Sequence, residues 1–354
     1  MRFFLFLSIC AVFLYAATTA EDIYKVYKSK GIGAVEELLK KEFEPKEVLK
    51  ETPKEVKAKV KVAKVKNPTD KELISRDFWL KQLRNMDVQY GYYENTDSII
   101  MCEKEKKRCE VYSNTDEEGL KFVKSHDVIM GKSGDKIKRG DLKTPVGVYE
   151  VTKRFKPSDA FYGPLAFSLS YPNLYDSLRG KSGDGIWIHG KPLDGKDRED
   201  LSKGCVVMDN DDIKALDTEI NNKSTITIIG EHKVHKVTKE NVATILSEVY
   251  KWRHAWKVND VNTYLNFYSD EFKRADGSNK KAFTATKKSI FARKEAKTII
   301  FEDVSVAPYP MMDDRKVFRV SYNQTYKSPS FASKGEKEIY LELVGDKMSI
   351  LAEK

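Results

Sequence analysis

A cysteine and a histidine lie sixteen residues apart in a stretch that is rich in glycine. Cys205 stands in the segment 202–208 (SKGCVVM), and His189 stands in the segment 186–190 (IWIHG). A cysteine flanked by small residues on a tight turn can expose its sulfur, and a nearby imidazole can accept the thiol proton. The resulting thiolate attacks carbonyl carbon, so the pair predicts acyl transfer through a covalent intermediate.

Two other interpretations of this pair are a buried structural contact and half of a metal site. A zinc site usually has four ligands at recognisable spacing. Elsewhere the chain offers His232 and His235 as a close pair, and this spacing alone is a poor metal signal. His126 heads an apolar run and is expected to be structural. The whole constellation favours catalysis, and we expect no metal and no cofactor.

The elements around the pair are expected to be short strands. Apolar runs bounded by turn residues predict a mostly β domain over 97–231 with few helices. A single helix is expected at 209–220, just after the cysteine. The strands are expected at 98–102, 109–113, 126–131, 146–151, 185–189 and 225–229.

The regions on either side differ in pattern. Residues 21–96 are highly charged and partly helical. At 56–66, Val or Ala alternates almost strictly with Lys, which indicates an edge strand or an extended basic arm. This region is too polar for a large core and is expected to pack on a neighbouring domain or on a second copy. The alternative for about 45–69 is a partly disordered linker. In 238–354, helices precede long period-2 runs, which predicts an α+β domain.

The first twenty residues have the pattern of a secretory signal peptide. Arg2 precedes an apolar stretch at 3–17, and small residues at 18–20 offer a cleavage site. No later segment is long and apolar enough for a transmembrane helix, so we expect a periplasmic protein. Loss of Arg2 lowers the formal charge from +9 to +8. A basic surface suits an anionic partner such as cell-wall polymer, or serves solubility alone, and export disfavours nucleic acid.

Three cysteines remain once Cys10 leaves with the signal peptide. Cys102 and Cys109 bracket a polar turn between two short β-like runs. Cross-strand partners in such a hairpin can form a disulfide in an oxidising compartment, and the alternative is two unpaired thiols. Cys205 is the odd thiol in either case.

Residues 97–231 resemble the L,D-transpeptidase catalytic domain, also called the YkuD domain. The resemblance rests on the opening hairpin, the segment 143–149 (KTPVGVY), the His-Gly pair and the Ser-x-Gly-Cys turn at 202–205. It implies a YkuD-type β-sandwich that acts on peptidoglycan stem peptides. Cys205 would be the nucleophile and His189 its base, with the Gly190 carbonyl orienting the imidazole. Backbone N–H groups at the turn that holds Ser202 and Gly204 would form the oxyanion hole.

The chain departs from the family pattern beside the nucleophile. Lys203 replaces a common His, and Val207 stands where many members carry an Arg that suits an anionic substrate group. The lost Arg favours water as the acceptor, and Lys203 is a candidate replacement charge. Tyr162 and Trp187 are candidate substrate contacts, although aromatic residues beside a sheet commonly belong to the core.

The last domain resembles the nuclear-transport-factor-two-like (NTF2-like, or SnoaL-like) cone fold. The segments that carry this resemblance are 252–256 and 259–272. The aromatic residues there, Trp252, Trp256, Tyr264 and Tyr268, either line a pocket for a glycan or small ligand or pack the helices on the sheet. The pairing of domains is similar to the cell-shape L,D-carboxypeptidases of curved and helical Gram-negative bacteria. This implies a homodimer formed through the N-terminal region.

The expected function is therefore a peptidoglycan L,D-carboxypeptidase that removes terminal D-Ala from stem tetrapeptides through a cysteine thioester. One alternative is an L,D-transpeptidase that forms crosslinks or attaches amines. A second alternative is a wall-binding scaffold whose catalytic site is vestigial.

Overall fold

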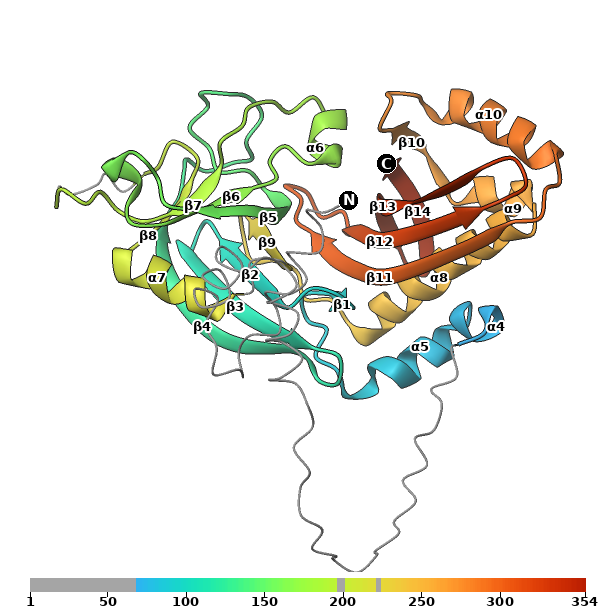
Figure 1. Cartoon of the computed structure of the whole chain (residues 1–354), viewed down its shortest axis with the longest axis horizontal. Coiled ribbons are helices and arrows are strands. Elements are labelled where there is room, and N and C mark those ends of the chain that lie inside the picture. Colours follow the sequence, from blue (N-terminus) through green and yellow to red (C-terminus); the bar gives the residue numbers. More distant parts are fainter. Residues whose placement is uncertain (1–67, 196–200, 221–223) are drawn as a thin grey trace, which may run out of the picture. The chain divides into compact units, whose positions relative to one another are not determined.

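The computed structural model describes residues 68–195, 201–220 and 224–354 (Figure 1). The signal-peptide prediction and the Val/Lys alternation at 56–66 therefore lie outside the described residues. Among the residues that are described, no helix is long and apolar enough to cross a membrane.

The first domain is a closed barrel whose strands follow the order β2-β3-β4-β8-β7-β6-β5-β9. β2 pairs in parallel with β9, and β9 pairs antiparallel with β5. The family resemblance predicts a sandwich of two sheets. In the structure, β9 joins the two through its pairing with β2 and β5, and the sheet closes into a barrel. The strands are β2 (Ser98–Glu103), β3 (Arg108–Thr115), β4 (Gly119–Ile129), β5 (Gly147–Phe155), β6 (Ala166–Leu169), β7 (Trp187–His189), β8 (Val206–Met208) and β9 (Thr225–Gly230).

Three short helical segments decorate the barrel: η2 (Ala160–Tyr162), α6 (Leu174–Leu178) and α7 (Asn210–Glu219). α7 follows β8 after a single residue, as the sequence pattern predicts. Its residues Ile213 and Leu216 are fully buried in the core of the barrel. This burial fixes the start of the helix against the strand that follows Cys205.

The second domain has a sheet in the order β1-β11-β12-β13-β14-β10. α8 lies against it and is largely buried, with Val, Ile, Leu and Trp side chains in the core of the domain. This is the α+β pattern expected from the sequence, with α10 and β10 as additions. The elements are β1 (Tyr92–Tyr93), α8 (Lys239–Lys257), α9 (Val261–Asn266), β10 (Tyr268–Arg274), α10 (Lys280–Ala292), β11 (Thr298–Tyr309), β12 (Val317–Lys327), β13 (Ala332–Val344) and β14 (Lys347–Glu353).

The described part of the charged N-terminal region completes this second domain. It forms α4 (Asp70–Leu73), α5 (Arg76–Gln82) and η1 (Leu83–Asn85), whose apolar residues enter the same core as α8. The Trp79 ring stacks on Tyr250 with the ring centroids 5.6 Å apart. The helical pattern at 70–86 thus packs on a domain that begins about 150 residues later in the chain.

Cys102 and Cys109 face each other across β2 and β3 and are joined by a disulfide. Both are fully buried. Closing a loop of this length removes entropy from the unfolded chain and should stabilise the domain by about 2–3 kcal/mol.

We expect the double variant Cys102→Ala/Cys109→Ala to lose about 2–3 kcal/mol of unfolding free energy, because its unfolded chain is less restricted. Urea denaturation of both proteins measures the difference. Wild-type protein unfolded in the presence of a reductant should match the variant. Equal stability of oxidised wild type and variant would contradict the argument.

Candidate active site

The turn that carries the cysteine is fixed by the side chain of a serine. The Ser202 N–H donates to the Met130 carbonyl at 2.9 Å, which ties the turn to the end of β4. Ser202 Oγ accepts from the Gly204 N–H at 3.1 Å and donates to the Cys205 carbonyl at 2.6 Å. The turn therefore has a defined backbone conformation directly before β8.

The backbone conformation just before Cys205 favours glycine. Gly204 has φ +129°, a region that side chains rarely adopt, and a Cβ there would lie 2.9 Å from the Lys143 carbonyl oxygen. Cys205 itself is half-buried, with Sγ 3.6 Å from the Gly185 carbonyl. Because the Gly204 N–H is engaged by Ser202, an oxyanion role for this group requires exchange of that hydrogen bond.

The imidazole is held by the backbone next to it. His189 ends β7 and is fully buried, and its Nδ1 lies 2.7 Å from the Gly190 carbonyl oxygen. A carbonyl can only accept, so Nδ1 carries the proton in this arrangement. Nε2 is then the basic nitrogen, and a general base requires this tautomer of the imidazole.

Strand pairing brings the two groups to one face of the sheet. β7 and β8 pair in parallel, with Ile188 opposite Val206 and His189 opposite Val207. Ile188 and Val206 belong to the barrel core, so the alternating His189 and Val207 face the other way. One step back along the chain from Val206, Cys205 lies on the His189 side. The structure thus places the predicted base at the end of β7 and the predicted nucleophile directly before β8, on the same face.

Aromatic residues border the histidine. The Tyr162 ring lies 5.0 Å from the His189 ring and 5.0 Å from the Trp187 ring, between ring centroids. Both aromatic side chains are half-buried, whereas the nearby Phe161 is exposed. Tyr162 and Trp187 therefore lie beside the candidate base, and their role as substrate contacts stays a prediction. Lys203 is exposed on the turn.

The position that carries Arg in many family members offers the substrate no charge here. Val207 is 1% exposed, so its side chain is covered by protein. The other predicted histidines lie elsewhere: His126 is buried between Asp212 and Glu219, and His232 is exposed beside Glu105. Within the described ranges, no cluster of three or more His, Cys, Asp or Glu could hold a metal ion.

The second domain contains a cavity of about 550 Å³ with a mixed lining. The apolar part of its wall is made of Trp252, Trp256, Tyr322 and Tyr326. The charged part is mainly basic, with Arg274, Lys287, Lys297 and Lys337 beside Glu295 and Glu353. Lys287 Nζ lies 5.0 Å from the Trp256 ring centroid and 4.9 Å from that of Phe283. Burial lowers the pKa of Lys287. Trp252 and Trp256 line this cavity, whereas Tyr264 and Tyr268 are buried in the core.

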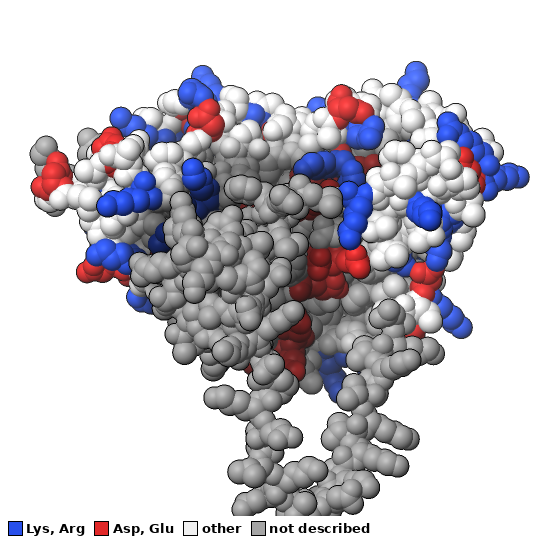
Figure 2. Space-filling view, viewed as in Figure 1, with Lys and Arg blue, Asp and Glu red and all other residues white. Residues whose placement is uncertain are grey.

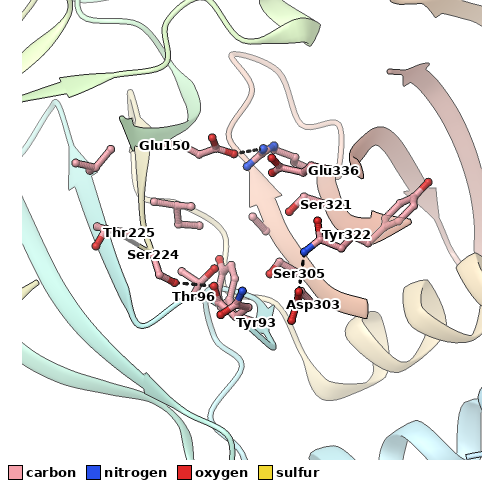
Figure 3. A pocket seen from close by; sticks show the side chains of 16 residues that line it. Tyr93, Thr96, Glu150, Ser224, Thr225, Asp303, Ser305, Ser321, Tyr322 and Glu336 are labelled. Atoms are coloured by element: carbon pink, nitrogen blue, oxygen red, sulfur yellow. Dashed lines mark hydrogen bonds and ion pairs between the residues drawn. The ribbon is translucent and has the colours of Figure 1, made fainter. Parts of the chain in front are cut away.

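A cavity of about 300 Å³ lies between β5 and β9 of the barrel and β11 to β13 of the second domain (Figure 3). Two pairs of its polar side chains are bound to each other. Glu150 pairs with Arg319, and Asn323 Nδ2 donates to Asp303 at 2.6 Å. Its walls come from separate segments of the chain, so no local sequence pattern predicts this cavity.

Charge on the molecular surface is mixed. On the face shown in Figure 2, Lys and Arg side chains are interspersed with Asp and Glu. Among the described residues visible on this face, positive charge does not gather into one uniform patch.

Comparisons with known proteins agree with this architecture. The L,D-transpeptidase catalytic domain family (YkuD) matches residues 97–229, and the Cds6 C-terminal NTF2-like domain family matches residues 244–354. The helical cell shape determining protein Pgp2 from Campylobacter jejuni is 37% identical, with a TM-score of 0.75 over 79% of this chain and 99% of that chain. Bd1075 from Bdellovibrio bacteriovorus is 30% identical, with a TM-score of 0.60 over 76% of this chain and 96% of that chain.

A shorter match covers part of the barrel. The putative L,D-transpeptidase YafK of Escherichia coli K12 is 33% identical over 87 residues, which are 24% of this chain. The match spans 31% of the length of that curated relative.

We expect Gly204→Ala to slow alkylation of Cys205 and to lower the unfolding free energy by about 1–3 kcal/mol, because the backbone there is left-handed and crowded. The iodoacetamide reaction rate and urea denaturation measure the two effects. Gly335→Ala is the matched control, since a Cβ there meets nothing within 4 Å. If Gly204→Ala behaved like the control, the turn would not depend on glycine.

Proposed function

We propose that this chain, which belongs to the L,D-transpeptidase (YkuD) family, is a peptidoglycan L,D-carboxypeptidase that removes D-Ala from stem tetrapeptides. The observation that carries the proposal is the shared face of Cys205 and His189, with Nδ1 of the imidazole bound to the Gly190 carbonyl. Similarity to a helical cell shape determining protein supports a role in remodelling the wall.

The first half-reaction forms a thioester. His189 Nε2 accepts the Cys205 proton, and the thiolate attacks the carbonyl that joins the third stem residue to D-Ala. The tetrahedral oxyanion collapses, the C–N bond breaks, and the imidazolium returns its proton to the amine of departing D-Ala. An oxyanion donor typically lowers such a barrier by about 3 kcal/mol, and backbone N–H groups of the 204–205 turn are the proposed donors.

The second half-reaction decides between hydrolysis and transpeptidation. Water activated by His189 attacks the thioester carbonyl, the C–S bond breaks, and the tripeptide and free thiol are released. An amine in place of water would give a crosslink or an exchanged product, as in an L,D-transpeptidase. The buried Val207 offers an anionic acceptor no guanidinium, which supports water as the acceptor.

We expect the protein to convert disaccharide tetrapeptide to tripeptide and D-Ala, and Cys205→Ala to release at least about a thousandfold less, because it lacks the nucleophile. Mass spectrometry of the products measures both. Adding glycine or a D-amino acid as acceptor tests the transpeptidase alternative, since exchanged product in place of tripeptide would contradict hydrolysis. Full rescue of a deletion strain by Cys205→Ala would favour the scaffold.

The cellular setting is a further part of this proposal. A peptidoglycan substrate is consistent with export to the periplasm through residues 1–20, and the N-terminal region is the proposed site of homodimer formation. Both segments lie largely outside the described residues. Cell fractionation and measurement of the mass in solution test the two points.

We also propose that the cavity of the second domain binds a wall fragment that presents both sugar or apolar surface and a carboxylate. Aromatic walls suit the first feature, and the surrounding Lys and Arg side chains suit the second. This assigns the second domain a targeting role beside the catalytic barrel.

We expect binding of a muropeptide carboxylate to weaken as pH rises through the lowered pKa of Lys287, because the attracting charge is lost there. Titration calorimetry from neutral to alkaline pH measures this on the Cys205→Ala protein. Lys287→Met should bind weakly at every pH, and Lys287→Arg should keep binding at alkaline pH. The exposed Lys288→Met is the control, and an unchanged Lys287→Met would refute the site.

A further inference from the structure

One peptide group beside the histidine is held on both of its polar sides. The Gly190 carbonyl lies 2.7 Å from His189 Nδ1, and the N–H of the same peptide, on Lys191, donates to Asn210 Oδ1 at 2.9 Å. We propose that Asn210 is a positioning residue that holds this peptide plane so that its carbonyl faces the imidazole. The inference deepens the proposed function and rests on it, because it concerns the base of that reaction.

The packing around the Asn210 side chain leaves no room for a Cβ atom at Gly190. A Cβ on Gly190 would collide with Asn210 Oδ1, and a Cβ on Gly163 would lie 2.6 Å from the Gly190 Cα. Gly163 also has φ +76°. Any residue at 190 could supply a carbonyl, so the glycine there is explained by the approach of the Asn210 side chain.

The Asn210 side chain connects the segment that carries Cys205 to the segment that follows His189. Asn210 is the first residue of α7 and follows β8, which begins directly after Cys205. An ion pair between Lys191 and Asp209 adds a second tie between the two segments. These two contacts therefore anchor the segment after Cys205 to the loop at Gly190 and Lys191 that orients the imidazole.

A capping role does not account for Asn210. The residue that precedes α7 as its N-cap is Asp209, and Asn210 Oδ1 is used across the fold on Lys191. Without that acceptor the Lys191 N–H loses its partner, which typically costs about 1–3 kcal/mol when the group is shielded from water. Rotation of the peptide recovers part of this cost, and it turns the Gly190 carbonyl away from Nδ1. Nε2 then no longer stays in its proton-accepting form.

The test compares Asn210→Leu, which removes the acceptor at similar size, with Asn210→Asp, which keeps an oxygen at the same place. The first readout is the pH dependence of Cys205 alkylation by iodoacetamide, which needs no peptidoglycan. We expect Asn210→Leu to react about 10–100-fold more slowly at neutral pH, with the midpoint of its profile moved to higher pH. Asn210→Asp should stay close to wild type.

The second readout is tetrapeptide turnover, in which Asn210→Leu should lose kcat with little change in KM. A wild-type alkylation profile in folded Asn210→Leu would overturn the proposal, as would equal loss in the Leu and Asp variants. Asn210→Ala replaces the Leu variant if that protein does not fold. If the alkylation profiles shift as expected while wild type releases no D-Ala, the positioning role stands and the proposed carboxypeptidase activity fails.

Discussion

The parallel pairing of two very short strands is the constraint on which the active site depends. β7 and β8 contribute only three residues each, and their register sets His189 beside Val207. Slipping that register by one residue would turn Cys205 toward the barrel core and away from the imidazole. Isolated strands of this length could not hold such a register. β6 on one side and β4 on the other hold it, because the barrel leaves neither strand as an edge.

Backbone groups carry out tasks that carboxylate or amide side chains perform in many other enzymes. A carbonyl orients the imidazole, and a serine hydroxyl bridges two backbone groups of the turn that carries Cys205. A peptide group cannot change rotamer, so its orientation must come from what packs against it. That explains the glycines at 163, 190 and 204, where a Cβ would displace neighbouring backbone or side-chain atoms. The chemistry of the site is therefore inseparable from close packing of the chain on itself.

Because the site depends on contacts between distant segments, the sequence could predict some of its features and not others. The hairpin around Cys102, the helix α7 and the long strands of the second domain have strong local patterns and were predicted. The residue types of Cys205 and His189, with the family resemblance, identified the candidate pair. β6 and β8 are too short for a periodic signal, and Asn210 has no local mark because its role depends on contact with Lys191. The apolar face of α5 predicted burial and could not name α8 as its partner.

Buried polar contacts make the second domain part of the barrel's framework. Tyr309 on β11 donates to Asp176 at 3.0 Å, and Asp176 pairs with Lys181 at 2.7 Å. Lys181 also pairs with Asp135 at 2.6 Å, and Asp135 accepts from the Val146 N–H just before β5 at 2.9 Å. Charges this deeply buried are tolerated only while every partner is present, because removal of one leaves an uncompensated ion. The cone domain therefore does more than bring a second cavity to the enzyme. Its strand β11 supplies a hydroxyl to the same network that fixes the entry to β5, so the two domains share one set of buried polar contacts.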